Sequence, residues 1–318
     1  PIRTFVESLG GPVLCTYMGK GVIPDEHPQW AGIFTGGAIE RPLMESADRI
    51  VLLGVDPVEF IRKPWTYSPP VIDLCERVFM PHYLVPEQRL TGDLNAIVHA
   101  LAPCGGDVAW QPAELAAYKQ GFLDGMNVPS DGSLDSTAIV QDAARCFAPT
   151  RRVSVDAGAH MFSACAFWPC NEPLDLLISN GLASMGFAVP AAIAAALADP
   201  ARGAVALTGD GGLLMCLGEL RTAAESGARV CIIVFNDACL SLIDIKRQDR
   251  QLPPLGMSWA PPDFAAVARG FGLKAWNAST EEEFAHALGE AQSVDGPCLI
   301  DARVDPATYP EQIKRLRG

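Results

Sequence analysis

The sequence predicts an α/β protein with two doubly wound domains, each built on a parallel sheet. Short apolar runs, typical of buried strands, alternate along the chain with longer segments of helical periodicity. Such alternation predicts parallel strands joined by crossover helices. Turn-rich stretches, PCGGDVAWQP and GMNVPSDGS, separate two regions of this kind. We therefore expect one domain over residues 1–102, a linker over 103–132 and a second domain over 133–318.

The first region opens with the end of a helix, at 2–9, which leads straight into a strand. We therefore expect further residues upstream of this helix. The other elements expected here are strands at 12–17, 49–55 and 70–75 and a helix at 93–102, and a short helix is expected within the linker at about 113–123.

The second region repeats the strand–helix alternation several times. Its segment VCIIVF is continuously apolar, as expected for a parallel strand that is covered on both faces. Helices are expected at 136–148, within 178–198, at about 212–226, near 263–271 and at 281–292, and strands at 152–158, 174–179, 203–209, 229–237, 273–278 and 297–304. Gly227 is placed to cap the helix at 212–226, and residues 238–262 are expected to form a loop.

Composition excludes several classes of function. The chain is 49% apolar and 19% charged, which is typical of globular proteins, and its net charge of −13 argues against a nucleic-acid-binding surface. Its ten cysteines form no CxxC pair, so we expect reduced thiols and a cytoplasmic protein. The uncharged stretch 178–198 is interrupted by Gly181, Gly186 and Pro190, and it predicts a buried helix instead of a membrane span.

A carboxylate stands among glycines at one predicted strand-to-helix turn. In LTGDGGLLMCLGE, Asp210 follows an apolar strand and directly precedes a helical pattern, and Asp237 follows the next strand. Both acids are therefore expected at the carboxyl edge of a parallel sheet, where ligands bind. Glycine N–H groups at a helix start favour an anion, which two acids would repel unless Mg²⁺ lay between them. The alternative is a generic turn in which Asp210 is solvated.

Several segments resemble a known family. GDGGLLMCLGELRTAAESGARVCIIVFNDACLSLI resembles the diphosphate-binding motif of thiamin diphosphate enzymes, in which Asn or Asp follows GDG after a crossover. VDAGAHMFSACAFWP and ISNGLASMGFAVPAAIAAAL resemble the flanking motifs of the acetolactate synthase-like group. GGPVLCTYMGKGVIPDEHP and ESADRIVLLGVDPVEF resemble the central domain of that group. The resemblance implies a central Rossmann-like domain followed by a thiamin-diphosphate-binding domain.

The resemblance also implies ligand roles for individual residues. Mg²⁺ would be held by the side chains of Asp210 and Asp237 and by the backbone carbonyl of Cys239. The residues expected to bind the cofactor are Gly211, Gly212, Ala159 and His160 at the diphosphate, Met185 as a wedge that bends the cofactor, the Ala183 carbonyl as an acceptor for its aminopyrimidine, and also Gly209, Asp210, Asp237 and Leu240. Two alternatives stay open, namely a helix-capping group for His160 and a core side chain for Met185.

The chain also departs from the family's pattern. Asp237 and the segment GVDPVEFIRKPW resemble the flavin-free catabolic type, so no FAD is expected. Lys246 stands where those synthases place a substrate-facing glutamine, which puts pyruvate as the acceptor in doubt. No segment matches the pyrimidine-binding domain, whose glutamate does the family's acid–base work on the cofactor. We therefore expect no catalytic residue within this chain.

Two hypotheses about function follow. The resemblance implies a decarboxylase or carboligase, a transferase or lyase that acts on a 2-oxo acid and whose active site needs a pyrimidine domain in cis or from another subunit of a homodimer or tetramer. The alternative is a cofactor-binding fragment that is inactive without that domain. A nicotinamide dehydrogenase is disfavoured because no GxGxxG with a downstream acid follows a strand. No nucleic acid or membrane partner is expected.

Overall fold

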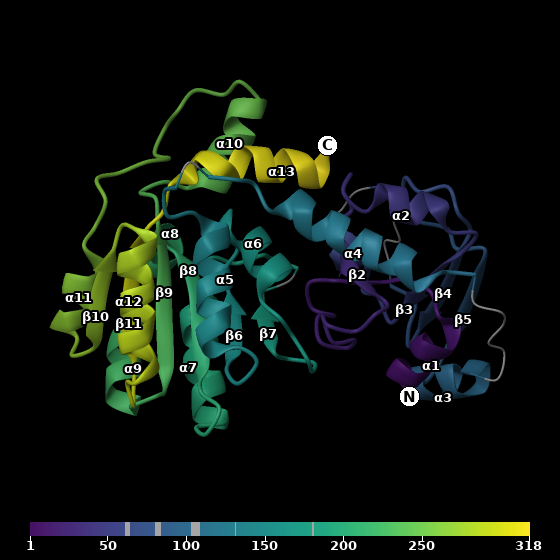
Figure 1. Ribbon diagram of the computed structural model, residues 1–318, viewed down its shortest axis with the longest axis horizontal. Coiled ribbons are helices and arrows are strands. Elements are labelled where there is room, and N and C mark those ends of the chain that lie inside the picture. The colour runs from purple at the N-terminus through teal and green to yellow at the C-terminus, as the bar shows by residue number, and fades with distance from the viewer. Residues whose placement is uncertain (61–63, 80–83, 103–108, 131, 180) are drawn as a thin grey trace. The chain divides into compact units, whose positions relative to one another are not determined.

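The computed structural model describes residues 1–318 except for 61–63, 80–83, 103–108, 131 and 180 (Figure 1). The chain divides into two compact units. Unit 1 comprises residues 1–126, 171–173 and 313–318, and unit 2 comprises 127–170 and 174–312. The domain limits expected at 102 and 133 stay a prediction, and residues 103–108 and 131 of the expected linker lie outside the described residues.

Unit 2 is built on a six-stranded sheet in which every pair of neighbouring strands is parallel. Its spatial order is β10-β11-β9-β8-β6-β7. The strands are β6 (Arg152–Val155), β7 (Leu176–Ile178), β8 (Ala204–Gly209), β9 (Val230–Asn236), β10 (Lys274–Ala278) and β11 (Cys298–Arg303). All residues of β9 are buried, as the continuously apolar segment predicted.

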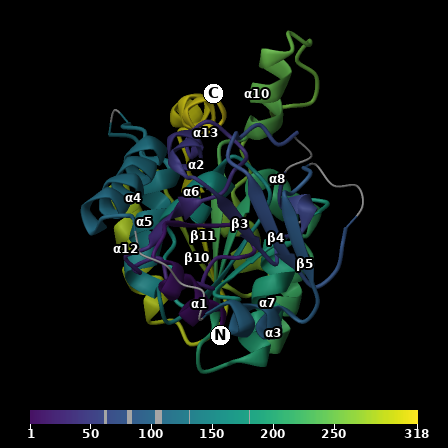
Figure 2. The same cartoon turned by 90° about the vertical axis from the view of Figure 1, so that its right-hand side faces the viewer.

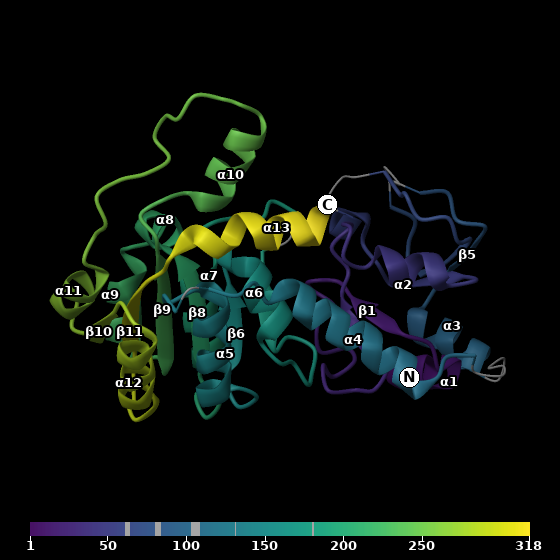
Figure 3. The same ribbon diagram turned by 45° about the horizontal axis from the view of Figure 1, so that its top comes forward.

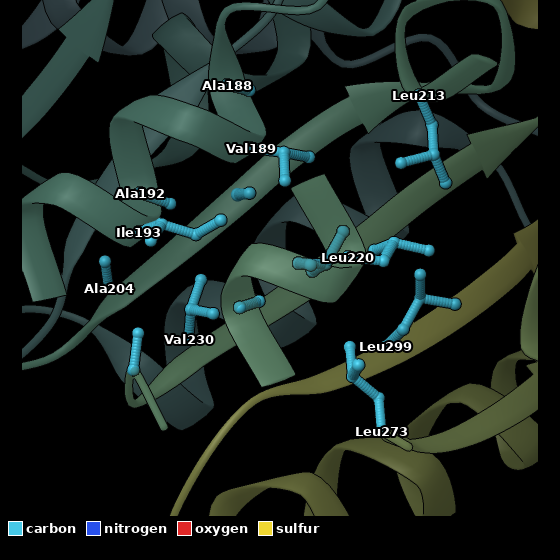
Figure 4. Close-up of a cluster of buried hydrophobic side chains, with 14 of the residues drawn as sticks. Ala188, Val189, Ala192, Ile193, Ala204, Leu213, Leu220, Val230, Leu273 and Leu299 are labelled. Carbon is cyan, nitrogen blue, oxygen red and sulfur yellow. The ribbon is translucent and has the colours of Figure 1, made fainter. Parts of the chain in front are cut away.

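Helices cover both faces of this sheet, so the predicted doubly wound α/β class is confirmed for unit 2. One face carries α7 (Ala188–Ala198), α9 (Glu219–Ser226) and α11 (Phe264–Gly270), and the other carries α5 (Ser136–Phe147), α6 (His160–Phe167) and α12 (Glu281–Gln292). Figure 4 shows side chains of α7 and α9 gathered against those of β8, β9 and β11. This buried cluster stabilises the sheet, and the sheet in turn positions the loops at its carboxyl edge.

Local capping explains several helix limits. Thr280 accepts a hydrogen bond from the Glu283 N–H at 3.2 Å and begins α12, whose first turn holds three glutamates. Asp263 caps α11 in the same way, by accepting from the Ala266 N–H at 2.8 Å. Gly227 ends α9 with a left-handed φ of 64°, which confirms the predicted cap.

Two expectations for unit 2 are wrong. The single helix expected at about 212–226 is two helices, α8 (Asp210–Met215) and α9, because the chain leaves helical geometry at Cys216 with φ −128° and resumes after Gly218. The loop expected over 238–262 contains α10 (Ser241–Asp249). That helix buries none of its residues, and so its sequence lacks the apolar stripe that reveals a helix.

Unit 1 contains two parallel sheets instead of the single sheet expected from the sequence. One pairs β1 (Val13–Cys15) with β2 (Trp30–Ile33), and the other has the order β3-β4-β5, made of Ile50–Leu53, Val71–Cys75 and Gln88–Thr91. Figure 2 shows β3, β4 and β5 side by side, and β1 can be followed in Figure 3. The helices of this unit are α1 (Ile2–Leu9), α2 (Arg41–Ser46), α3 (Leu94–Leu101) and α4 (Pro112–Met126). Finally, α13 (Tyr309–Arg317) begins in unit 2 and its residues from Ile313 onward belong to unit 1.

Within the described part of the chain, no helix has both the length and the apolar character needed to cross a membrane. The alanine-rich stretch that could suggest a span forms the buried helix α7, as predicted.

Candidate functional site

A cavity of about 200 Å³ opens at the carboxyl edge of the unit 2 sheet, where residues that follow β6, β8 and β9 line it. The strand order changes direction here, because β7 lies on one side of β6 while β8 lies on the other. In open α/β sheets, ligands bind at such a switch point. The topology alone therefore marks this cavity as a candidate ligand site.

Every residue to which the resemblance gives a ligand role lines this cavity. These residues come from four segments that are far apart in the sequence, and they are Ala159, His160, Ala183, Met185, Gly209, Asp210, Gly211, Gly212, Asp237, Cys239 and Leu240. Lys246 of α10 lines the cavity as well. The structure thus brings the predicted residues together, and their ligand roles stay predictions.

The two acids of the predicted metal site differ in how their oxygens are used. Asp210 is 2% exposed, and its Oδ1 accepts a hydrogen bond from the Gly211 N–H at 2.6 Å. Its Oδ2 is buried and meets no hydrogen-bond donor. Asp237 accepts from the Cys239 N–H at 3.0 Å through Oδ1 and from the Ser241 hydroxyl at 2.6 Å through Oδ2. A buried carboxylate oxygen without a donor is costly unless a ligand supplies a partner.

Burial, together with the charge of Asp237, raises the pKa of Asp210 to about 7. Backbone N–H groups of Gly211, Ala238 and Cys239 oppose this rise by stabilising the charged form. Burial also raises the pKa of Asp237. Two carboxylates whose charged forms are disfavoured in this way gain most from a cation placed between them.

A divalent cation fits this arrangement, provided that other oxygens complete its coordination. Among the described residues, no group of three or more His, Cys, Asp or Glu side chains could hold a metal ion. The carboxylates of Asp210 and Asp237 would therefore coordinate the cation together with a backbone carbonyl and with oxygens brought by a ligand. The Oδ2 of Asp210 is one of the oxygens available for this. Mg²⁺ is bound in this way, by one or two carboxylates together with phosphate oxygens.

The two glycines after Asp210 are closely packed. A Cβ at Gly212 would lie 2.2 Å from the Asp156 Oδ2, which is held by hydrogen bonds, so close packing requires a glycine there. A Cβ at Gly211 would lie 2.7 Å from Cδ2 of Leu240 and 3.0 Å from Cε of Met185, so these two side chains would have to shift.

His160 forms one wall of the cavity beneath the glycine turn. Its ring is 4% exposed and stacks on Phe235, with a centroid separation of 4.8 Å. Burial lowers the pKa of His160 to about 4, so the imidazole is neutral at pH 7. It is the first residue of α6, and α6 has no side-chain cap, which argues against the capping interpretation. Its Nε2 is buried without a hydrogen-bond partner and can therefore meet a ligand.

Two loops of the site hold alanine in the left-handed region of backbone conformation. Ala183 has φ 49°, and Ala238, which lies between Asp237 and Cys239, has φ 57°. A residue with a Cβ carries strain in this region, and such strain clusters at ligand sites. Met185, two residues beyond Ala183, is half-buried and is not part of the buried core, which argues against a purely structural role.

Comparison with known families decides what this cavity belongs to. Residues 156–302, which include the whole glycine turn and both acids, match the family described as "Thiamine pyrophosphate enzyme, C-terminal TPP binding domain". Residues 1–101 match "Thiamine pyrophosphate enzyme, central domain". The chain belongs to the thiamine pyrophosphate enzymes. The predicted family and its two domain types are thereby confirmed, and so is the α/β fold class.

Curated relatives in the thiamine pyrophosphate enzyme family cover nearly all of the chain. It is 27% identical to an acetolactate synthase of Bacillus subtilis (strain 168) over 317 residues, which are 96% of this chain and 55% of that protein. It is also 27% identical to acetolactate synthase isozyme 1 large subunit of Escherichia coli (strain K12), covering 96% of this chain and 56% of that protein. A catabolic acetolactate synthase of Raoultella terrigena is 28% identical over 86% of this chain and 50% of its own length. The chain thus spans about half the length of the curated relatives it matches.

One residue that supports this candidate site was not predicted from the sequence. Asp156, at the end of β6, is fully buried and accepts hydrogen bonds from the N–H groups of Gly186 at 3.1 Å and of Phe187 and Ala188 at 2.7 Å. It also accepts from the Thr208 hydroxyl at 2.6 Å. Asp156 therefore ties the loop that carries Ala183 and Met185 to β8. The strand predicted at 152–158 contained Asp156, whereas β6 ends at Val155. With that strand end, the signal that revealed Asp237, an acid directly after a strand, would have found Asp156.

Proposed function

We propose that this chain is the cofactor-binding part of a thiamin-diphosphate- and Mg²⁺-dependent decarboxylase or carboligase that acts on a 2-oxo acid and resembles acetolactate synthase. The observation that carries the proposal is a pair of acids, the buried Asp210 and the half-buried Asp237, beside a glycine turn within the family-matched segment. The unsatisfied Oδ2 of Asp210 fits a cation ligand. The names of the curated relatives favour this class of reaction.

Each part of the site has a proposed task. Asp210, Asp237 and the Cys239 carbonyl hold Mg²⁺, while N–H groups of the turn at Gly209, Gly211 and Gly212 meet the diphosphate together with Ala159 and His160. Met185 and Leu240 shape the cavity where the cofactor bends, and the Ala183 carbonyl accepts a hydrogen bond from the aminopyrimidine. When bound, thiamin diphosphate supplies the carbon nucleophile and the electron sink for loss of CO₂.

The active site is completed by a pyrimidine domain, in cis or from another subunit of a homodimer or tetramer. That domain supplies the acid–base glutamate, and so no catalytic residue is assigned to this chain. Small 2-oxo acids are the substrates, no FAD is required, and the protein is cytoplasmic. The alternative, a cofactor-binding fragment that is inactive by itself, predicts binding without turnover for the 318-residue chain.

Titration calorimetry with thiamin diphosphate, with and without Mg²⁺, tests the proposal. The Asp210→Ala variant should lose at least about tenfold in cofactor affinity in the presence of Mg²⁺, since one metal ligand is gone. Glu225→Ala, which removes an exposed acid of α9, is the matched control and should bind as the wild type does. Unchanged binding by Asp210→Ala would reject the assignment.

A second experiment separates the enzyme from the inactive fragment. The chain is mixed with a separately produced pyrimidine domain, and CO₂ release from pyruvate and other 2-oxo acids is measured. Turnover only in the mixture supports an incomplete active site. Steady turnover by the chain alone would contradict the fragment hypothesis, and no turnover despite intact cofactor binding would remove the enzyme hypothesis.

A further inference from the structure

The chain between α10 and α11 returns to the carboxyl edge of the unit 2 sheet after an exposed stretch. Residues 250–256 are all exposed, and the path of this part of the chain can be followed in Figure 1. From Met257 onward, the chain forms hydrogen bonds with the turn that follows β9. We call residues 257–262 the return segment. It lies in a stretch for which the sequence indicated only a loop.

The return segment pairs with the turn after β9 through two backbone hydrogen bonds. The Leu240 N–H donates to the Met257 carbonyl at 2.8 Å, and the Trp259 N–H donates to the Ala238 carbonyl at 3.1 Å. Together they form a short antiparallel bridge at Cys239. The second bond also holds Ala238, whose φ of 57° is left-handed, in a conformation that a residue with a Cβ rarely adopts. The return segment therefore helps to fix the shape of this turn.

The bridge determines the direction in which the Cys239 carbonyl points. In a trans peptide, the C=O and the N–H point in opposite directions. Because the Ala238 C=O and the Leu240 N–H both face the return segment, the N–H and the C=O of Cys239 face away from it. Accordingly, the Cys239 N–H donates to the Asp237 Oδ1 at 3.0 Å. Among the described residues, no donor bonds to the Cys239 carbonyl, which leaves this oxygen available to a metal ion.

The side chain of Trp259 reaches the other turn of the site. Its Cη2 lies 3.5 Å from the position that a Cβ would take at Gly211. Gly211 directly follows Asp210, and its N–H donates to the Asp210 Oδ1 at 2.6 Å. The Trp259 side chain is half-buried, and its Nε1 is buried. Trp259 therefore contacts the turns of both predicted metal-binding acids, one through its backbone N–H and the other through its ring.

The far end of the return segment is anchored to the sheet itself. The Pro262 carbonyl accepts hydrogen bonds from the Asn236 Nδ2 at 3.1 Å and from the Arg303 guanidinium at 2.6 Å. Asn236 is the last residue of β9, is 2% exposed and also donates to Asp301 of β11 at 2.8 Å. The return segment is thus bonded at both ends to β9 or to the turn that follows it, and so the position of Trp259 is well defined.

We propose that Trp259 is a positioning residue of the metal site and that the return segment makes this site selective for Mg²⁺ over Ca²⁺. The inference rests on the proposed function, because it takes Asp210, Asp237 and the Cys239 carbonyl as metal ligands. Mg²⁺ requires oxygens at about 2.0–2.1 Å in near-ideal octahedral geometry, whereas Ca²⁺ accepts about 2.3–2.6 Å and a flexible geometry. Two turns that one residue holds together meet the stricter requirement.

Calorimetric titrations with Mg²⁺ and with Ca²⁺, each in the presence of saturating thiamin diphosphate, test the role of Trp259. The Trp259→Ala variant should bind Mg²⁺ about 10- to 100-fold more weakly, as is typical when a group that orients metal ligands is lost. Its affinity for Ca²⁺ should change by less than about threefold, because Ca²⁺ tolerates displaced ligands. Trp259→Phe keeps an aromatic ring, and its ratio of Mg²⁺ to Ca²⁺ affinity should lie between those of the wild type and Trp259→Ala.

The matched control is Trp276→Ala. Trp276 is also half-buried and belongs to unit 2, but it lies on β10, which β11 separates from β9. Its truncation should lower the free energy of unfolding and leave both metal affinities unchanged, so that a loss of stability is distinguished from a loss of selectivity. Equal losses for Mg²⁺ and Ca²⁺ in Trp259→Ala, or no loss for either ion, would overturn the proposal.

Hydrogen exchange of the wild type covers the case in which Trp259→Ala folds poorly. If the return segment favours Mg²⁺ binding, Mg²⁺ must stabilise the return segment in turn. With thiamin diphosphate present and each ion at the same multiple of its dissociation constant, Mg²⁺ should slow exchange of the Leu240 and Trp259 amides at least about tenfold more than Ca²⁺ does. Equal protection by the two ions would overturn the proposal.

The failure of this inference can be distinguished from the failure of the proposed function. If the wild type shows no metal-dependent binding of thiamin diphosphate, both are rejected. If Asp210→Ala loses the cofactor but Trp259→Ala keeps the wild-type preference for Mg²⁺, only the role of Trp259 is rejected.

Discussion

Each unit of the chain buries an aspartate within or beside a parallel sheet, but the two acids have different surroundings. In unit 1, Asp73 of β4 is 2% exposed and accepts a hydrogen bond from the Arg89 guanidinium at 2.8 Å. In unit 2, Asp210 is equally buried, its nearest charge is another acid, and its Oδ2 has no donor. A satisfied buried charge indicates a structural role, whereas an unsatisfied one beside a like charge indicates a place for a ligand.

The sheets of the two units also differ in how deeply their apolar strands are buried. The unit 2 strands β8 and β9 are almost wholly buried between two helical layers, so the sheet is complete. In unit 1, β3 is equally apolar in sequence and yet partly exposed, because it lines a cavity of about 760 Å³. The same apolar pattern therefore contributes different amounts of stability, according to how much of it the surrounding structure buries.

The largest effect that sharpens this contrast comes from truncating one strand residue in each unit. Ile232→Ala in β9, where the side chain is fully buried, should lower the free energy of unfolding by about 2–5 kcal/mol. Val51→Ala in β3, at 38% exposure, should lower it by less than about 1 kcal/mol. Urea denaturation followed by circular dichroism measures both, and hydrogen exchange identifies the unit that opens. Equal losses would contradict the contrast.

The two buried acids should respond in opposite directions to neutralisation. Asp73→Asn leaves Arg89 without its charged partner and should cost about 1–3 kcal/mol of unfolding free energy. Asp210→Asn should instead stabilise the metal-free chain at pH 8, because it removes a charge that burial and the neighbouring Asp237 both disfavour. Urea denaturation at pH 8 in the presence of a chelator measures the change in unfolding free energy for both variants. Destabilisation by both variants would mean that Asp210 is an ordinary structural acid.

The pH dependence of stability also shows whether the charge of Asp210 destabilises the metal-free chain. Because burial raises the pKa of Asp210 from 3.8 to about 7, the folded chain keeps a proton that the unfolded chain has released. Asp210 therefore makes the metal-free chain less stable as the pH rises from about 4 to about 7, and the loss is complete above that range. In Asp210→Asn, this part of the pH dependence should disappear, and saturating Mg²⁺ with thiamin diphosphate should reduce it in the wild type.

A helix or strand could be predicted from the sequence where its apolar and capping residues form a clear pattern. The helix at 281–292 was predicted to the residue, because a threonine cap and three first-turn acids mark its start. The strand β5, Gln88–Thr91, was missed because it is largely exposed and its sequence QRLT is not apolar. In the same way, α10 was missed because it buries nothing. Length matters too, since the short strand β2, Trp30–Ile33, was also missed although all four of its residues are buried. Local patterns therefore reveal elements that are both buried and long.

The site could be predicted further than the fold around it. Asp210 and Asp237 were found because acids at the ends of consecutive parallel strands must meet at one edge of the sheet. The structure adds what spacing cannot give: the close contact of Gly212 with Asp156, and the bonds from Asp156 to the Met185 loop. These contacts join segments about 30 to 50 residues apart, and only the folded topology specifies them.

The smallest effect concerns backbone strain at the site. Ala183→Gly removes a left-handed strain of about 1–2 kcal/mol, and the extra freedom of glycine in the unfolded chain offsets about half of that. The net gain in unfolding free energy should therefore stay below about 1 kcal/mol. Gln251→Gly is the matched control, since Gln251 has a similar φ of 54° and does not line the cavity. Both variants should gain similar stability, but only Ala183→Gly should weaken cofactor binding, because a looser loop must be ordered by the ligand. Equal cofactor affinity in calorimetry for the two variants would show that the strain at Ala183 has no part in holding the ligand.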